Sequence, residues 1–188
     1  MSIKRTILAT ALALTGLSSQ ALDLSRDIDL FGDAATGYSA GISDTSGTLV
    51  NHAVSGQFSD TFRFSYSGSA IVDVWLDTSV SESRLATQQI VFSSATLNGM
   101  ALTIAPVFSS RGTRFSSASL DQVPATGSFT LVVNGYAGLF GSSGQAISAS
   151  YSGGLNASPL AVPEPASYAL MLGGLIAIGF MSNRRSRR

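Results

Sequence analysis

One predicted strand combines an aromatic ring with two carboxylates. Residues 70–77 alternate between apolar and polar types, which predicts a β-strand with Asp73, Trp75 and Asp77 together on its outward face. An aromatic ring flanked by acids can contact a sugar ring. The two carboxylates do not fit a glycosidase pair, because four residues along a strand separate them by about 13 Å, beyond the roughly 5–10 Å that such enzymes use. The three residues are therefore a candidate glycan contact, and a half-exposed tryptophan packed by a loop is the plainer alternative.

A group of acidic residues near the start of the chain offers carboxylates of the kind that Ca²⁺ prefers. Apolar residues interrupt the group and the spacing of an EF-hand is absent, so charges along a solvated strand edge are the expected role. No metal site and no cofactor are expected. The group consists of Asp23, Asp27, Asp29 and Asp33.

Asp60 stands on an otherwise aromatic face. Residues 58–66 alternate so that Phe58, Phe62, Phe64 and Tyr66 share one side of a predicted strand, and Asp60 falls on that side too. A carboxylate there could ligate calcium or accept backbone N–H groups at a bulge. The hydrogen-bonded role is expected, because a buried carboxylate needs donors.

The residue inventory argues against an enzyme. The chain has no cysteine, which excludes disulfides, thiol catalysis and cysteine-ligated metals. Its single histidine, His52, is placed by the sequence in a polar loop. Serines are abundant, but no nucleophile elbow stands between a strand and a helix, and the Gly-rich stretches lack the lysine and helix of a phosphate-binding loop.

Length and charge narrow the class of protein further. The chain has 188 residues and a mass of 19.4 kDa, which suits one domain, and 45% hydrophobic residues can form a core. Eleven basic and eleven acidic residues cancel overall. Six of the basic residues lie at the two ends, so the interior holds five against eleven, a net charge of −6. An acidic interior does not favour nucleic acid, whose binding depends on neutralising phosphates.

The interior predicts an all-β fold, an antiparallel β-sandwich or jelly-roll-like domain over residues 22–157. Short alternating or apolar runs are separated by Gly- and Ser-rich turns, and no segment shows a sustained helical period. Residues 67–69, Ser-Gly-Ser, predict a hairpin between the first two runs. Residues 157–159 predict a linker to the tail. The predicted strands are 58–66, 70–77, 89–93, 101–108, 128–134 and 146–151.

The N-terminus has the three parts of a secretory signal peptide. Lys4 and Arg5 precede an apolar run over residues 6–17, which ends at a small-residue site formed by Ser19 and Ala21. Residues 1–21 are therefore expected to be removed after export, with cleavage following Ala21.

The C-terminal segment, residues 158–188, combines a linker with three further elements. The tripeptide Pro163, Glu164, Pro165 favours an extended, exposed backbone. Residues 166–183 carry no charge and predict a transmembrane helix of about the bilayer's thickness. A basic cluster follows, which the positive-inside rule places in the cytoplasm. The cluster consists of Arg184, Arg185, Arg187 and Arg188. A plain tail anchor is the simpler alternative.

In this order the three elements resemble the PEP-CTERM sorting signal of Gram-negative bacteria. The resemblance implies an exosortase-type membrane enzyme as partner, a transient anchor in the inner membrane, and then the cell surface or the extracellular space. Members of that group are associated with exopolysaccharide and the biofilm matrix. Two interior stretches also resemble the FxDxF subfamily, for which no activity is implied. They are residues 58–62, FSDTF, and the Gly-rich ending at 150–156, SYSGGLN.

The sequence thus predicts an exported, non-enzymatic β protein with a structural or interaction role in an extracellular polysaccharide matrix. A carbohydrate-binding module that uses Trp75 with Asp73 and Asp77 is the alternative. An ice-binding surface ranks behind both, because its regular threonine array is missing from a sequence whose threonines are scattered.

Overall fold

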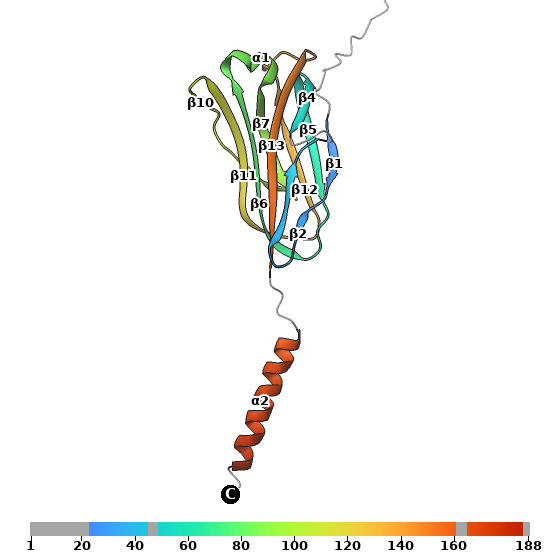
Figure 1. Ribbon diagram of the computed structural model, residues 1–188, viewed down its shortest axis with the longest axis vertical. Coiled ribbons are helices and arrows are strands. Elements are labelled where there is room, and N and C mark those ends of the chain that lie inside the picture. Colours follow the sequence, from blue (N-terminus) through green and yellow to red (C-terminus); the bar gives the residue numbers. More distant parts are fainter. Residues whose placement is uncertain (1–22, 45–48, 161–164, 186–188) are drawn as a thin grey trace, which may run out of the picture.

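The computed structural model describes residues 23–44, 49–160 and 165–185, which form a β domain and one long helix (Figure 1). The strands are β1 (Ser25–Ile28), β2 (Phe31–Asp33), β3 (Gly37–Ile42), β4 (Val50–Val54), β5 (Gly56–Phe64), β6 (Ser69–Ser81), β7 (Ile90–Leu97), β8 (Met100–Ala101), β9 (Thr103–Ile104), β10 (Phe108–Ser110), β11 (Thr113–Thr126), β12 (Phe129–Ala137) and β13 (Ala146–Pro159). The helical elements are η1 (Glu82–Arg84), α1 (Leu85–Gln88) and α2 (Pro165–Arg185).

The strands form two sheets. The smaller sheet has the order β1-β5-β12-β7-β8, and the larger has the order β10-β11-β6-β13-β3-β2, with β4 added on β13 and β9 on β11. Strand β1 pairs with β5 in parallel, and the other pairings described are antiparallel. The expected all-β, antiparallel fold class is confirmed.

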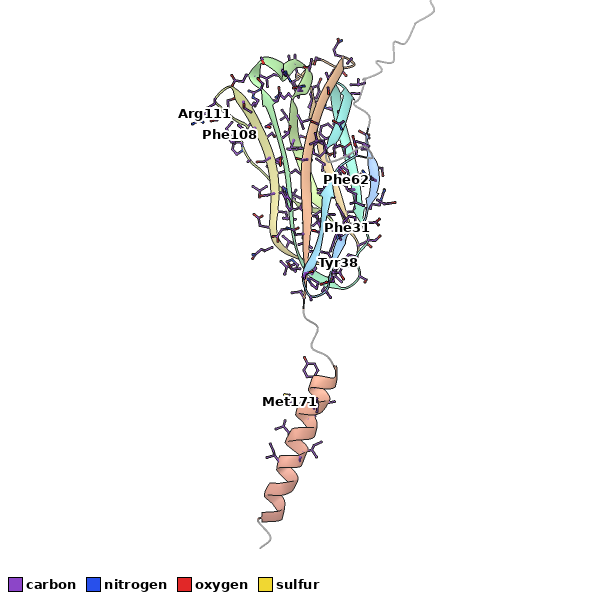
Figure 2. All side chains as sticks on the ribbon, in the orientation of Figure 1. Phe31, Tyr38, Phe62, Phe108, Arg111 and Met171 are labelled. Carbon is purple, nitrogen blue, oxygen red and sulfur yellow. The ribbon has the colours of Figure 1, made fainter. Side chains whose placement is uncertain are left out.

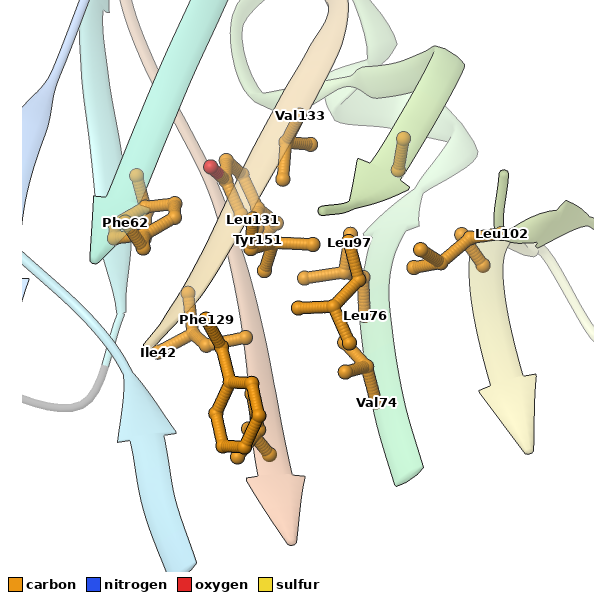
Figure 3. Packing of buried hydrophobic residues seen from close by; sticks show 14 of the residues in the cluster. Ile42, Phe62, Val74, Leu76, Leu97, Leu102, Phe129, Leu131, Val133 and Tyr151 are labelled. Atoms are coloured by element: carbon orange, nitrogen blue, oxygen red, sulfur yellow. The ribbon is translucent and has the colours of Figure 1, made fainter. Parts of the chain in front are cut away.

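The two sheets enclose one core between their apolar faces (Figure 3). Strands β5, β6 and β12 alternate strictly, so every second side chain points inward and is buried. Phe62, Phe129 and Leu131 come from the smaller sheet, and Leu76 and Tyr151 come from the larger. Burying a large apolar side chain of this kind contributes roughly 1.5–3 kcal/mol, so the core is what holds the sheets together.

The predicted hairpin between the first two runs is wrong. Strand β5 pairs with β1 and β12, whereas β6 pairs with β11 and β13, so the link between them crosses from one sheet to the other. The link between β11 and β12 crosses beside it, and Gly127 N–H donates to the Gly68 carbonyl at 2.9 Å. Both runs present an apolar face to the same core, which a hairpin and a crossing link satisfy equally well.

Other strand predictions were incomplete. The predicted strand over residues 101–108 is replaced by the short strands β8, β9 and β10. The sequence missed β1 to β4 and the fourteen-residue β11, which is rich in serine and contains Pro124. Because serine is small and polar, β11 does not show the alternation of apolar and polar residues that predicts a strand. It nevertheless pairs with β6 along most of its length.

The C-terminal boundary of the domain also differs from the expectation. Residues 157–159 are not a linker but the end of β13, where they pair with residues 70–72 of β6. The helix expected over residues 166–183 is present as α2. Judged by length and mean hydropathy together, no helix in the part of the chain that the structure describes qualifies as a membrane span.

Several predicted processing residues lie outside the described residues or have no described side chain. The signal peptide, with Ser19 and Ala21, is outside, as are Pro163, Glu164, Arg187 and Arg188. Pro165, Arg184 and Arg185 belong to α2 by their backbone alone.

Candidate functional site

The carboxylate of Asp60 is the centre of a buried polar cluster that joins the two sheets. Asp60 is fully buried on β5. Its Oδ1 accepts a hydrogen bond from Leu24 N–H at 2.9 Å. Its Oδ2 accepts one from the Tyr151 hydroxyl of β13 at 2.6 Å and lies 3.0 Å from His52 Nε2 on β4. The expectation that Asp60 accepts structural hydrogen bonds is confirmed, and two of the partners are side chains, of which Tyr151 is distant in sequence.

His52 is part of this cluster and not of a polar loop, which corrects the sequence-based placement. It lies in β4, and its side chain is fully buried. Because a carboxylate only accepts, the proton between the two groups sits on Nε2. Nδ1 is buried and has no hydrogen-bond partner among the described residues. The imidazole stacks on Phe58, with ring centroids 4.3 Å apart, so its environment fits a structural role in the core.

Tyr151 supplies the shortest hydrogen bond of the cluster. Burial of its hydroxyl, followed by the negative charge of Asp60 and the hydrogen bond to it, raises the pKa of Tyr151 well above the ordinary value of 10.0. The proton is therefore held on the tyrosine oxygen, where it is donated to Asp60. Residues 58–62 and the Gly-rich ending, which are far apart in sequence, meet at this hydrogen bond.

The predicted glycan contact has the geometry that strand alternation requires. Asp73, Trp75 and Asp77 share the outer face of β6, and the indole of Trp75 is 43% exposed. The six-membered ring of the indole fills the space above Gly154 of β13, where a Cβ atom would lie 2.2 Å from indole Cζ2. Trp75 is thus packed against the neighbouring backbone and half-exposed, which is compatible with a glycan contact and with the plainer structural alternative.

Both carboxylates beside Trp75 already accept hydrogen bonds. Asp73 Oδ1 accepts from Gln122 N–H at 2.6 Å, where β11 bulges between Leu120 and Val123. Gln122 has a φ of 52°, a left-handed conformation that this bond helps to hold. Asp77 Oδ2 accepts from the Ser152 hydroxyl at 3.1 Å. One oxygen of each carboxylate already accepts a hydrogen bond within the larger sheet, so only part of each carboxylate is available to a ligand.

Two carboxylates of the acidic group near the start of the chain, Asp33 and Asp23, accept hydrogen bonds from the surrounding chain. Asp33 Oδ1 accepts from Ala35 N–H, Thr36 N–H and the Thr36 hydroxyl, which lowers the pKa of Asp33, the Thr36 backbone bond having the largest effect. Asp23 Oδ1 accepts from Ser59 N–H at 2.8 Å. Among the described residues, no three His, Asp or Glu side chains gather as metal ligands would.

Sequence reasoning missed a groove on the outer face of the smaller sheet. It has a volume of about 510 Å³ and crosses the adjacent strands β5, β12 and β7. Tyr136 and Asn134 of β12 lie on its floor, Gln57 of β5 lies beside them, and Phe140 stands at its rim on the loop between β12 and β13. No motif marks these residues, because they come from two strands and a loop that are separate in the sequence.

Comparison with known proteins gave no relationship that assigns the site. No protein-family model, curated protein or solved structure matches this chain.

Proposed function

We propose that this chain is an exported surface protein, a β-sandwich domain delivered by a C-terminal sorting signal of the PEP-CTERM type. In this proposal an exosortase-type enzyme recognises the segment from Pro163 to the arginine cluster while residues 166–183 are held in the inner membrane. The β domain then reaches the cell surface or the extracellular space, where it takes a structural or interaction role in a polysaccharide matrix. No reaction is assigned to the domain.

The observation that carries the proposal is the surface of α2. Its described side chains, residues 168–178, include large apolar groups in full contact with solvent, such as Leu170, Ile176 and Ile178, which are 67–78% exposed. Met171 also projects from the helix (Figure 2). The described side chains of α2 are apolar on every side of the helix, which favours an apolar surrounding such as lipid, although α2 does not qualify as a membrane span by length and mean hydropathy together. The helix lies apart from the β domain in Figure 1, and the adjoining arginines fit the cytoplasmic boundary of a membrane.

The proposal also requires that the β domain keep its fold once the C-terminal segment has been removed. This is expected, because the last strand of the domain ends before the Pro163 to Pro165 tripeptide. Strand β13 runs to Pro159 and pairs with β6 up to Ala70. Leu160 N–H donates to the Ser69 carbonyl at 2.9 Å, which closes the last strand. Removal of everything after residue 165 would therefore take away no strand and no core residue among those described.

Fractionation of producing cells tests the sorting proposal. The native chain is expected in the surface or extracellular fraction of cells with an active exosortase. Replacing the four arginines of the C-terminal cluster with glutamine is expected to leave the chain in the inner membrane. The matched control replaces Arg111 and Arg114 of the β domain with glutamine and is expected to leave sorting unchanged. Complete retention of the native chain in the inner membrane would refute the proposal.

A second candidate function is glycan binding at Trp75, favoured by its exposed and firmly seated indole. If Trp75 binds a glycan, an array of immobilised glycans shows at least one glycan whose binding Trp75→Ala abolishes. A blank array, or binding that Trp75→Ala leaves unchanged, would remove this candidate.

A further inference from the structure

The groove on the smaller sheet is built from two rows of neighbouring side chains. Strand pairing places Gln57, Tyr136 and Val91 in one row across β5, β12 and β7. Ser59 and Asn134 form the next row. Adjacent rows on one face of a sheet lie about 7 Å apart, so the groove offers a floor of regularly spaced polar and aromatic groups.

Two aromatic rings in contact form an apolar surface in this groove. The rings of Tyr136 and Phe140 are 5.1 Å apart and tilted by 41°. Phe140 is 89% exposed, which leaves a large apolar ring in solvent at the rim. An aromatic ring next to amide and hydroxyl groups suits a ligand that is apolar on one face and carries hydrogen-bonding groups at its edge.

The groove is poor in charge. Among the residues that the structure describes, its lining includes no lysine or arginine and one carboxylate, that of Asp23, whose Oδ1 is already bonded to Ser59 N–H. The remaining polar groups are amides and hydroxyls, which donate and accept without a net charge. An anionic ligand would find no cationic side chain among these described lining residues, whereas a neutral, hydroxyl-rich ligand could use both kinds of group.

The Tyr136 hydroxyl is a further sign that the groove is incomplete without a bound molecule. This oxygen is shielded from solvent and has no hydrogen-bond partner among the described residues. A polar group in this state carries an uncompensated desolvation cost. A hydrogen bond to a ligand hydroxyl, made as the exposed Phe140 adjusts, would remove that cost.

The floor of the groove is closely packed against the core. Gly135, between Asn134 and Tyr136, has no room for a side chain, because a Cβ atom would lie 2.5 Å from Cζ of the buried Phe58. Strand β7 carries a bulge at Ser93 where it passes the groove, since Asn134 pairs with Ser94 and Gly135 pairs with Phe92. Bulges re-aim side chains beside binding sites, and close packing of the floor favours side chains that are already in place before a ligand binds.

We propose that the groove over β5, β12 and β7 binds a neutral oligosaccharide, with a sugar ring against Phe140 and Tyr136 and its hydroxyls on Asn134 and Gln57. This site lies on the other sheet from Trp75. It does not depend on the C-terminal sorting signal, so its failure and that of the sorting proposal are separate results.

Calorimetric titration of the full chain in a zwitterionic detergent without sugar headgroups tests the proposal. The probes are neutral hexasaccharides of glucose, mannose and galactose, with a hexasaccharide of uronic acid as the charged counterpart. At least one neutral probe is expected to bind saturably. Phe140→Ala is expected to weaken this binding roughly tenfold, and circular dichroism of the variant is expected to match that of the native chain because Phe140 is exposed.

Matched controls identify the site. Phe108→Ala removes another exposed aromatic ring, 57% exposed on β10 of the larger sheet, and is expected to leave affinity unchanged. Trp75→Ala is expected to leave it unchanged as well, whereas Tyr136→Phe is expected to weaken it several-fold. Absence of saturable binding to every neutral probe, equal binding to the uronic acid probe, insensitivity to Phe140→Ala or loss of binding in Trp75→Ala would each overturn the proposal.

Discussion

Replacing Asp60 with asparagine is expected to lower the free energy of unfolding by about 2 kcal/mol. The carboxylate accepts from Leu24 N–H at Oδ1, and from the Tyr151 hydroxyl and His52 Nε2 at Oδ2. Asparagine keeps an acceptor for Leu24, but it places an NH₂ group where Oδ2 faced two donors. His52 can change tautomer and accept from that group, because its Nδ1 makes no other hydrogen bond among the described residues.

The size of this loss in unfolding free energy is set by the Tyr151 hydroxyl, which keeps no acceptor in the variant. The Tyr151 hydroxyl has lost its acceptor in the Asp60→Asn variant, and Tyr151 is 1% exposed, so water does not replace it. A buried donor left without a partner costs about 1–3 kcal/mol. Asp60→Leu would strand all three donors and is expected to cost more, about 3–6 kcal/mol. These costs arise between sheets, so they should reduce the stability of the whole domain.

Urea unfolding followed by the fluorescence of Trp75, the only tryptophan of the chain, measures the effect. A loss of about 2 kcal/mol corresponds to a fall of about 1 M in the urea midpoint. Asp77→Asn is the matched control, because Asp77 accepts one exposed bond from Ser152, and its expected change is below about 0.5 kcal/mol. Tyr151→Phe combined with Asp60→Asn should cost less than the sum of the two single changes. An Asp60→Asn variant as stable as the Asp77→Asn control would refute the reasoning.

Three further predictions concern pH and the Trp75 face. Because burial, and then Asp60, raise the pKa of folded Tyr151 above its unfolded value of 10.0, this tyrosine stabilises the fold below pH 10, and the contribution is lost as the pH rises further. Urea titrations at pH 9 to 11 should therefore show a decline that Tyr151→Phe reduces, and an identical decline in that variant would contradict the assignment. Gly154→Ala should displace the indole of Trp75, shift its emission and cost about 1–3 kcal/mol, whereas Gly41→Ala, whose Cβ meets nothing within 4 Å, should be nearly neutral in the same assay. Asp73→Ala should cost about 1 kcal/mol by releasing Gln122 N–H, and hydrogen exchange at that amide should accelerate; unchanged exchange would argue against the bond.

The faces of the strands could be predicted from the sequence, but their partners could not. Strands β5 and β6 alternate large apolar and polar residues, so the burial of Phe62 and the exposure of Trp75 follow directly. The same alternation is satisfied whether the link after Phe64 forms a hairpin or crosses to the other sheet. Strand β11 could be recognised only from its pairing with neighbouring strands such as β6, and not from its sequence. Serines stand where apolar residues would have produced an alternating pattern.

The candidate sites show the same limit. Asp60 was expected to accept hydrogen bonds because it stands among aromatic residues, but His52 and Tyr151 could not be assigned to it without knowing which strands meet. Ser-rich and Gly-rich surroundings made His52 look like a loop residue, although β4 adds to β13 at Ala149. The groove had no sequence signal at all, because Gln57 and Asn134 become neighbours only through the pairing of β5 with β12.

The intact mass of the protein recovered outside producing cells tests the central claim most directly. The account predicts a chain that begins at Leu22 and ends near the Pro163 to Pro165 tripeptide, without residues 166–188. A protein recovered outside the cell that still carries Phe180 and the four C-terminal arginines would contradict it.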